Sequence, residues 1–180
     1  MNVNIEFFSD DALENIATSL HYNIDKNIFI GYANKIDTAR KRNLTGLINN
    51  VLNIRNVEYV EVEEKNLNDI TYKLLSTVER EQSSGNSCYF NLTGGDDLIL
   101  VAAGIVAAHT NVPVHQLDII DNTLCDFIIE DIDTRMSSLL KDEPIILSLS
   151  NYMKFRGTCI NYRMKKTFKT QLSDPQFISD

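Results

Sequence analysis

Residues 88–103 read CYFNLTGGDDLILVAA, which is a short apolar run, a glycine pair and a long apolar run. The first run, Cys88–Leu92, is too short for a helix and rich in aromatic residues, so it predicts a buried strand. The pair Gly94-Gly95 ends this strand. Asp96 then begins a helix whose first turn holds carboxylates at the positive end of the helix dipole. This order places backbone N–H groups at the carboxyl edge of a sheet, where open α/β folds bind small, often phosphorylated ligands.

The glycine pair by itself does not identify a ligand. Two glycines between a strand and a helix commonly form only a tight turn. The general phosphate-binding signatures GxxxxGK[ST] and GxGxxG are absent from the sequence. Asp96 and Asp97 also place negative charge where an anion-binding turn favours none. From these residues alone we expect a loop at the edge of a sheet.

Strands and helices alternate on both sides of this stretch. β-rich runs predict strands at 3–8, 27–32, 57–62, 114–120 and 124–129, and amphipathic patterns predict helices at 12–21, 37–53 and 67–81. Residues 131–140 have no clear pattern, and 145–149 resemble a strand. We therefore expect a Rossmann-like α/β fold. Its sheet is mostly parallel with helices on both faces, and a C-terminal β-hairpin and a linker segment follow.

A topological switch point in such a sheet brings together the loops after the first and fourth strands. Ser9 and Asp10 follow the first strand, and Thr93, Gly94 and Gly95 follow the fourth. Glycines let a phosphate or sugar approach the backbone closely, and a threonine hydroxyl adds a donor. Ser9 and Asp10 can hydrogen-bond a ribose or an adenine edge, and they are equally good helix caps.

Other polar residues near this edge have two interpretations each. Tyr32 ends the second strand, where it either stacks on a base or belongs to the rim of the core. Asp96 and Asp97 form either a helix cap, which we favour, or a carboxylate pair for acid–base chemistry or a metal. Lys35 and Arg40 are cations that can offset this acidic charge. No spacing of nucleophile and base is recognisable, so the sequence assigns no catalytic residue, metal site or cofactor.

The composition limits the classes of function. A length of 180 residues indicates one domain of about 150 residues with an extension. The net charge is −8, yet residues 144–173 hold six basic side chains and no acidic one. We expect a ligand-sensing domain at 1–143 and a basic C-terminal extension or linker at 144–180. The acidic body argues against binding duplex nucleic acid. The basic segment contacts nucleic acid, the acidic body or an absent domain, or is simply solvated.

We expect a cytoplasmic protein. The apolar runs are too short to cross a membrane, and the N-terminus has no signal-peptide pattern. Cys88, Cys125 and Cys159 are odd in number and widely spaced, which fits reduced thiols better than disulfides or zinc. The run 98–108 is apolar on nearly every side and must be largely buried, either in the core of one chain or against a second copy across a two-fold axis.

The string FNLTGG at residues 90–95, which leads into an Ala-rich helix, resembles the signature of the CRISPR-associated Rossmann fold (CARF) domain. It is most similar to the branch found at the N-terminus of CRISPR ancillary nucleases, and the order of elements fits over residues 1–160. In that branch Asn-Leu-Thr-Gly-Gly is followed by Thr-Lys. This chain has Asp96-Asp97 instead, which removes the cation nearest the expected ligand.

The resemblance implies a sensor of a cyclic oligoadenylate second messenger in type III CRISPR antiviral defence. The ligand, most often the tetramer, is bound across a homodimer, and the nuclease effector is fused or separate. Some members cleave their ligand, so a ring nuclease is the first alternative, and a regulatory interaction domain that has lost its nucleotide is the second. The ligand-binding residues that we expect are Ser9, Asp10, Tyr32, Asn91, Thr93, Gly94, Gly95, Asp96 and Asp97.

Overall fold

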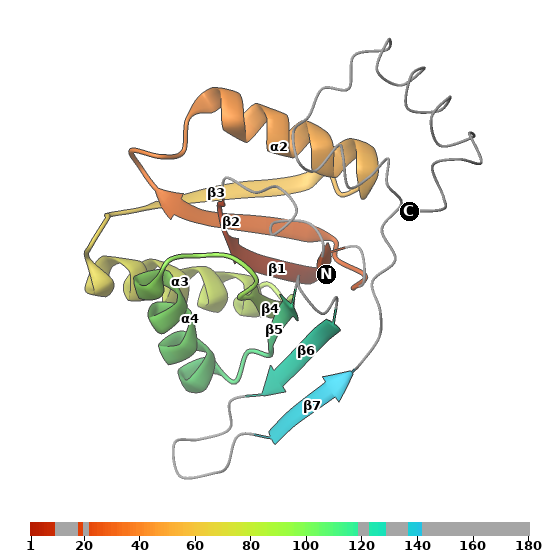
Figure 1. Ribbon diagram of the computed structural model, residues 1–180, viewed down its shortest axis with the longest axis vertical. Coiled ribbons are helices and arrows are strands. Elements are labelled where there is room, and N and C mark those ends of the chain that lie inside the picture. Colours follow the sequence, from red (N-terminus) through yellow and green to blue (C-terminus); the bar gives the residue numbers. More distant parts are fainter. Residues whose placement is uncertain (10–17, 20–21, 119–122, 129–136, 142–180) are drawn as a thin grey trace, which may run out of the picture. The chain divides into compact units, whose positions relative to one another are not determined.

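The computed structural model describes residues 1–9, 18–19, 22–118, 123–128 and 137–141. Within this part of the chain, seven strands form one sheet in the order β3-β2-β1-β4-β5-β6-β7 (Figure 1). The elements are β1 (Asn2–Phe7), β2 (Lys26–Tyr32), α2 (Thr38–Val51), β3 (Asn56–Val62), α3 (Leu67–Ser83), β4 (Ser87–Asn91), α4 (Asp97–Thr110), β5 (Val114–Asp118), β6 (Thr123–Ile128) and β7 (Ser137–Lys141).

The sheet is mostly parallel. Strands β3, β2, β1, β4 and β5 run parallel to one another, and β6 and β7 are added as antiparallel strands. The chain moves outward from β1 toward β3 and then returns to β4, so the strand order reverses between β1 and β4. This is the switch point of a Rossmann-like sheet, and the predicted fold class is confirmed.

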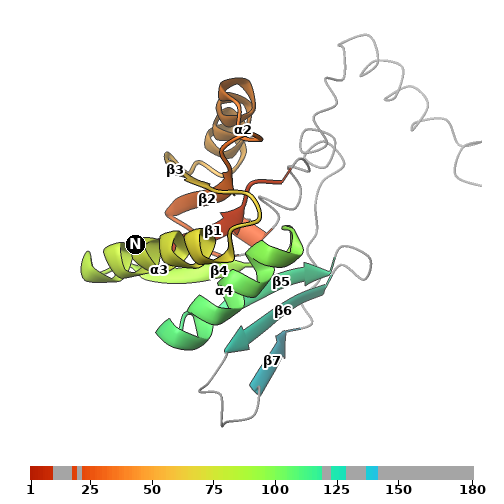
Figure 2. The same ribbon diagram turned by 90° about the vertical axis from the view of Figure 1, so that its left-hand side faces the viewer.

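Helices cover both faces of this sheet (Figures 1 and 2). Helices α3 and α4 pack against one face, where Val3 and Ile5 of β1 belong to the main core cluster. Helix α2 lies over the opposite face, where Tyr59 of β3 donates a hydrogen bond to the carbonyl of Lys41 in α2. The neighbouring residue Val60 packs on the core of the first face, as alternation along a strand requires.

The core between the sheet and α3–α4 follows the pattern that the sequence predicts. Ile70, Leu74 and Val78 recur at every fourth position of α3 and are at most 1% exposed. Burying one such side chain stabilises the fold by roughly 1.5–3 kcal/mol. Asp37 caps α2, Asn66 caps α3 and Asp96 caps α4.

One strand of the structure was not predicted, and two predicted elements lie largely or wholly outside the described residues. Strand β7 falls in the stretch 131–140 to which the sequence assigned no element, because its order of two serines and two leucines lacks alternation. Its backbone pairing with β6 defines it instead. Of the helix predicted at 12–21, only Thr18 and Ser19 are described, and both are helical. The strand predicted at 145–149 lies outside the described residues.

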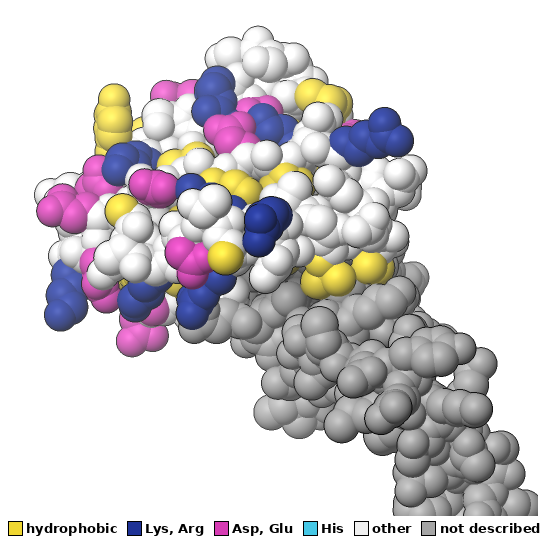
Figure 3. Space-filling view, turned by 90° about the horizontal axis from the view of Figure 1, so that it is seen from above, with side chains coloured by type: hydrophobic (Ala, Val, Ile, Leu, Met, Phe, Trp, Pro, Cys, Tyr) yellow, Lys and Arg dark blue, Asp and Glu magenta, His cyan; other side chains and the backbone are white. Residues whose placement is uncertain are grey.

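The chain divides into two compact units, Met1–Ile146 and Leu147–Asp180, and the second lies outside the described residues. The boundary predicted at residue 143 therefore stays a prediction, and so does the role of the basic extension. Among the described residues there is no helix with the length and apolar content that a membrane span requires. Acidic and basic side chains are interspersed on the face shown in Figure 3, where none forms a large patch of one sign.

Candidate ligand-binding site

A cleft of about 310 Å³ lies at the carboxyl edge of the sheet. Three segments line it: the end of β1, the segment from the end of β2 into the first turn of α2, and the turn between β4 and α4. The lining residues are Phe7, Phe8, Ser9, Lys35, Arg40, Gly95 and Asp96. Because β1 and β4 are neighbours at the switch point, the loops that follow them meet here, as the sequence predicts. Asp10 lies outside the described residues.

The turn after β4 is held from within the protein. The side-chain oxygen Oδ1 of Asn91 accepts hydrogen bonds from the backbone N of Thr93 at 2.9 Å and from its hydroxyl at 2.5 Å. The same hydroxyl accepts from the backbone N of Leu117 in β5 at 2.9 Å. The hydroxyl of Thr93, which the sequence suggested as a ligand donor, therefore fastens the turn to the neighbouring strand.

Gly95 gives the cleft an exposed stretch of backbone. Its φ of +132° lies in a region that residues with a side chain rarely adopt. A Cβ at this position would lie 3.4 Å from Phe7 Cβ and 3.4 Å from a methyl of Leu100, which is ordinary contact. The backbone conformation, and not a lack of space, is therefore what requires glycine here.

Asp96 acts as a cap and also links two loops. Its Oδ1 accepts from the backbone N of Ile99 at 3.1 Å, so it caps α4 as favoured from the sequence. Its Oδ2 accepts from the hydroxyl of Tyr32 at the end of β2. Burial raises the pKa of Tyr32, and the hydrogen bond to Asp96 raises it further, so the phenol stays protonated and donates. The ring of Tyr32 is 1% exposed and belongs to the core, while Asp97 is exposed in the first turn of α4.

Two cations line the cleft, and each has an acidic neighbour. Lys35 Nζ lies 5.0 Å from the centre of the Tyr32 ring and 3.2 Å from a carboxylate oxygen of Glu64. Arg40 Nε lies 3.3 Å from a carboxylate oxygen of Asp37, the cap of α2. Both side chains are about half exposed. Exposed ion pairs of this kind contribute about 0–1 kcal/mol to stability. An incoming anion can therefore replace Glu64 or Asp37 at small cost.

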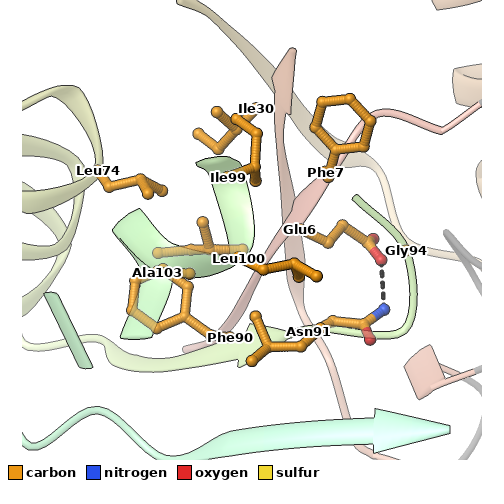
Figure 4. A pocket seen from close by; sticks show the side chains of 12 residues that line it. Glu6, Phe7, Ile30, Leu74, Phe90, Asn91, Gly94, Ile99, Leu100 and Ala103 are labelled. Carbon is orange, nitrogen blue, oxygen red and sulfur yellow. Dashed lines mark hydrogen bonds between the residues drawn. The ribbon is translucent and has the colours of Figure 1, made fainter. Parts of the chain in front are cut away.

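A second, internal hollow lies beneath the turn (Figure 4). Its volume is about 10 Å³, which is close to the space of one water molecule and excludes a nucleotide. Glu6 and Asn91 lie on one side of it, joined by a hydrogen bond, and apolar side chains of the core lie on the other. Of these two hollows, only the outer cleft has room for more than a water molecule.

The described residues contain no group of three side chains suited to hold a metal ion. His115 is buried and stacks on the ring of Tyr22 with centroids 4.6 Å apart, and His109 is exposed in the last turn of α4. Asp96 and Asp97 do not act as a pair, because the first is engaged in capping and in the contact with Tyr32.

Comparison with solved structures shows what this architecture is similar to. A protein from Vibrio cholerae, VC1899, matches with a TM-score of 0.63 and 18% identity over 86% of this chain and 39% of that one. Can2 from Sulfobacillus thermosulfidooxidans, solved in complex with cyclic tetra-adenylate, matches with 0.66 and 13% over 86% and 41%. A type III CRISPR defence DNA nuclease activated by cyclic oligoadenylate matches with 0.60 and 14% over 85% and 23%.

The chain shares its α/β fold with these three proteins. It spans less than half the length of each of them. No protein-family model matches its sequence, and a search of curated proteins found no match either. The likeness therefore concerns the fold.

Sequence reasoning found the two loops of the site but missed what holds them. Glu6, Leu117 and the link from Tyr32 to Asp96 were not predicted. A signal for Glu6 was present, because it alternates with the apolar Ile5 and therefore points to the other face of a strand that is covered on both sides. The partners of these side chains depend on strand register, which the sequence does not state.

Proposed function

We propose that this chain is a sensor domain that binds a cyclic oligoadenylate, the tetramer in the first instance, in the cleft between the loops after β1 and β4. One observation carries the proposal: a cleft of about 310 Å³, lined by Ser9, Gly95, Lys35 and Arg40, lies at the switch point of a Rossmann-like sheet. A match to Can2, solved with cyclic tetra-adenylate, supports the same ligand class.

Each part of the cleft suits one part of such a ligand. The exposed backbone at Gly95 admits the close approach of a ribose or phosphate. The hydroxyl of Ser9 suits a ribose or adenine edge. Lys35 and Arg40 supply positive charge toward the phosphates, in the place of the lysine that the CARF signature carries after its glycine pair.

We further propose that two copies pair through α4. Val101 and Ile105 lie one turn apart on this helix and are 50% and 49% exposed, while Ile99, Ala102, Ala103, Val106 and Ala107 on its inner side are buried. A second copy packed on this side would bring two turns with their glycine pairs close to a two-fold axis. A cyclic tetramer has a matching two-fold symmetry. The complex would act in the cytoplasm on a fused or separate nuclease effector.

The proposal is tested by a thermal-shift panel with cyclic oligoadenylates of different ring sizes, with linear oligoadenylate as the matched control. We expect at least one cyclic form to raise Tm by mass action, by an amount that grows with its concentration. Light scattering is expected to give twice the mass of the chain. A panel in which no cyclic form changes Tm, even at high excess, would contradict the sensor function.

The same samples test the ring-nuclease alternative. In-line attack by a ribose 2′-hydroxyl requires positioning more than dedicated side chains, so it is tested on the product. Chromatography of the ligand after long incubation is expected to return the intact ring. Linear products that increase with protein concentration would establish the enzyme instead.

A second candidate is a regulatory interaction domain without a nucleotide. The observation that favours it is the position of Asp96, whose carboxylate occupies the N-terminus of α4 where an anion would otherwise bind. Under this alternative, neither the natural chain nor a variant with Asp96→Asn, which keeps the cap and removes the charge, responds to any cyclic oligoadenylate. Binding by the natural chain rejects it.

A further inference from the structure

Glu6 is a buried carboxylate that faces away from the apolar core. Its side chain lies in the middle of the sheet, and the residue is 3% exposed. Oε1 accepts a hydrogen bond from Asn27 Nδ2 of β2 at 2.8 Å, and Oε2 accepts one from Asn91 Nδ2 of β4 at 2.7 Å. Burial raises the pKa of Glu6 well above its usual range, and the amide bonds oppose this shift. Burying a carboxylate lowers the stability of the fold, so we expect Glu6 to have a functional role that offsets this cost.

The bond to Asn91 fixes which end of the Asn91 amide faces the turn. Glu6 and Asn91 stand opposite each other in the register of β1 and β4. An asparagine amide has one donor end and one acceptor end. Because Glu6 accepts at both oxygens, the donor end of Asn91 points toward it (Figure 4). The acceptor end then faces the backbone N of Thr93.

The chain of hydrogen bonds then continues in one direction. The backbone N of Leu117 donates to the Thr93 hydroxyl, the hydroxyl donates to Asn91, and Asn91 donates to Glu6. The backbone N of Thr93 donates to the same oxygen of Asn91. Turning the Asn91 amide by half a rotation would set its NH₂ group against the Thr93 N–H and end that contact. The conformation of the turn therefore depends on an acceptor at position 6.

We infer that Glu6 is a positioning residue for the ligand-binding turn, acting through Asn91 and Thr93 and not by contact with the ligand. Only one part of its test, the measurement of ligand affinity, rests on the proposed function. The competing account is that Glu6 is only a buried polar residue without influence on the turn. In that case, losing its bond to Asn27 and losing its bond to Asn91 change the protein in the same way.

The chain provides a matched control for that distinction. Asn27 makes the same kind of bond to the other oxygen of the same carboxylate, from β2, on the side away from the turn. Replacing Asn27 or Asn91 by leucine removes one buried amide from Glu6 in each case. Only the second replacement cuts the path to Thr93.

The experiment compares Asn91→Leu, Asn27→Leu, Glu6→Leu and Glu6→Gln in three measurements: Tm, affinity for cyclic tetra-adenylate, and the amide NMR resonances of Gly94 and Gly95 without ligand. We expect Asn91→Leu and Glu6→Leu to shift both glycine resonances and to weaken binding about tenfold, as the loss of one buried hydrogen bond allows. Asn27→Leu is expected to lower Tm with both glycine resonances and the affinity unchanged.

Glu6→Gln is expected to rescue the turn. Its carbonyl can accept from Asn91 while its amide faces Asn27, whose Oδ1 has no partner among the described residues and can accept after rotation. If Glu6→Leu does not fold, Glu6→Met, which keeps the side-chain length and removes both carboxylate oxygens, must shift the same resonances.

Two results would overturn the inference: equal glycine shifts in Asn27→Leu and Asn91→Leu, or unshifted glycine resonances in Glu6→Leu. A natural chain that binds no cyclic oligoadenylate would refute the proposed function instead. The resonances would then still decide whether Glu6 positions the turn.

Discussion

The two faces of β1 and β4, the neighbouring strands at the switch point, carry different chemistry. The face under α3 and α4 is apolar, and Val3, Ile5 and Phe90 are packed there at no more than 1% exposure. The opposite face carries Glu6 and Asn91 at 3% exposure, joined by hydrogen bonds that lead to the turn. The comparison teaches that stability and site geometry are separated within single strands. Alternate residues of β1 and β4 serve one purpose or the other.

The largest expected effect is on stability and comes from a substitution in the apolar face alone. Leu74→Ala removes a side chain that is 1% exposed, and we expect a loss of about 2–5 kcal/mol in the free energy of unfolding. Urea denaturation measures it. Tyr72→Ala, on the same helix and 71% exposed, is the control and should change stability by less than about 0.5 kcal/mol. Because the turn is held from the other face, ligand affinity of the folded Leu74→Ala protein should stay within about twofold.

The polar face is expected to respond to pH. The pKa of Glu6 is raised in the folded protein, so its contribution to stability is fully present below the unfolded pKa and is lost as pH rises through the folded pKa. Glu6→Gln cannot titrate. We therefore expect the stability of the variant relative to the natural protein to increase with pH above about 4.5, by at most about 1.4 kcal/mol for each pH unit.

Parallel denaturant titrations of the two proteins from pH 5 to pH 8 measure this difference, with Asn27→Leu as a reference that keeps the carboxylate. A constant difference across this range would show that Glu6 does not titrate there.

The cations of the cleft give the next effect. Removing Lys35 and Arg40 together as alanines should weaken binding of cyclic tetra-adenylate about tenfold or more, and it should flatten the dependence of affinity on salt. Calorimetric titrations at two salt concentrations measure both. Arg42→Ala is the matched control, because Arg42 is exposed on the same helix and does not line the cleft. Equal losses in the control and the double variant would place the phosphates elsewhere.

The smallest expected effect sharpens the role of the acidic pair after the glycines. Replacing Asp96-Asp97 by Thr-Lys restores the sequence of the CARF signature, keeps a residue able to cap α4, and changes the local charge by three. We expect affinity for cyclic tetra-adenylate to rise by about threefold or more, measured by the same titrations. The gain is limited because Tyr32 loses its carboxylate partner. A decrease in affinity would mean that the acidic pair contacts the ligand directly.

Much of the fold could be predicted from the sequence, because hydrophobic period and capping residues are local signals. The strand predicted at Cys88–Leu92 and the helix predicted from Asp96 were found in this way, and their boundaries agree with the structure to within one residue. β7 was missed because Ser137–Lys141 lacks alternation and is defined by its pairing with β6.

The site was predicted less completely, for a physical reason. Which loops meet follows from the topology, and Ser9 and Gly95 do line one cleft. Which side chains bond each other follows from register, and the pairing of Glu6 with Asn91 joins residues 85 positions apart. Tyr32 had two proposed roles, base stacking or core rim. The structure buries its ring while the hydroxyl reaches Asp96, a combination that no local pattern states.

The central claim is that the cleft between the loops after β1 and β4 binds a cyclic oligoadenylate. Calorimetric titration of cyclic tetra-adenylate into the natural protein, repeated with Gly95→Val, tests it most directly. A valine cannot readily adopt the backbone conformation of Gly95, and it covers the exposed turn. The account predicts saturable binding with one ring per two chains, and its loss in a Gly95→Val protein that still melts cooperatively. Absence of binding to the natural protein, or unchanged binding in the variant, would contradict it.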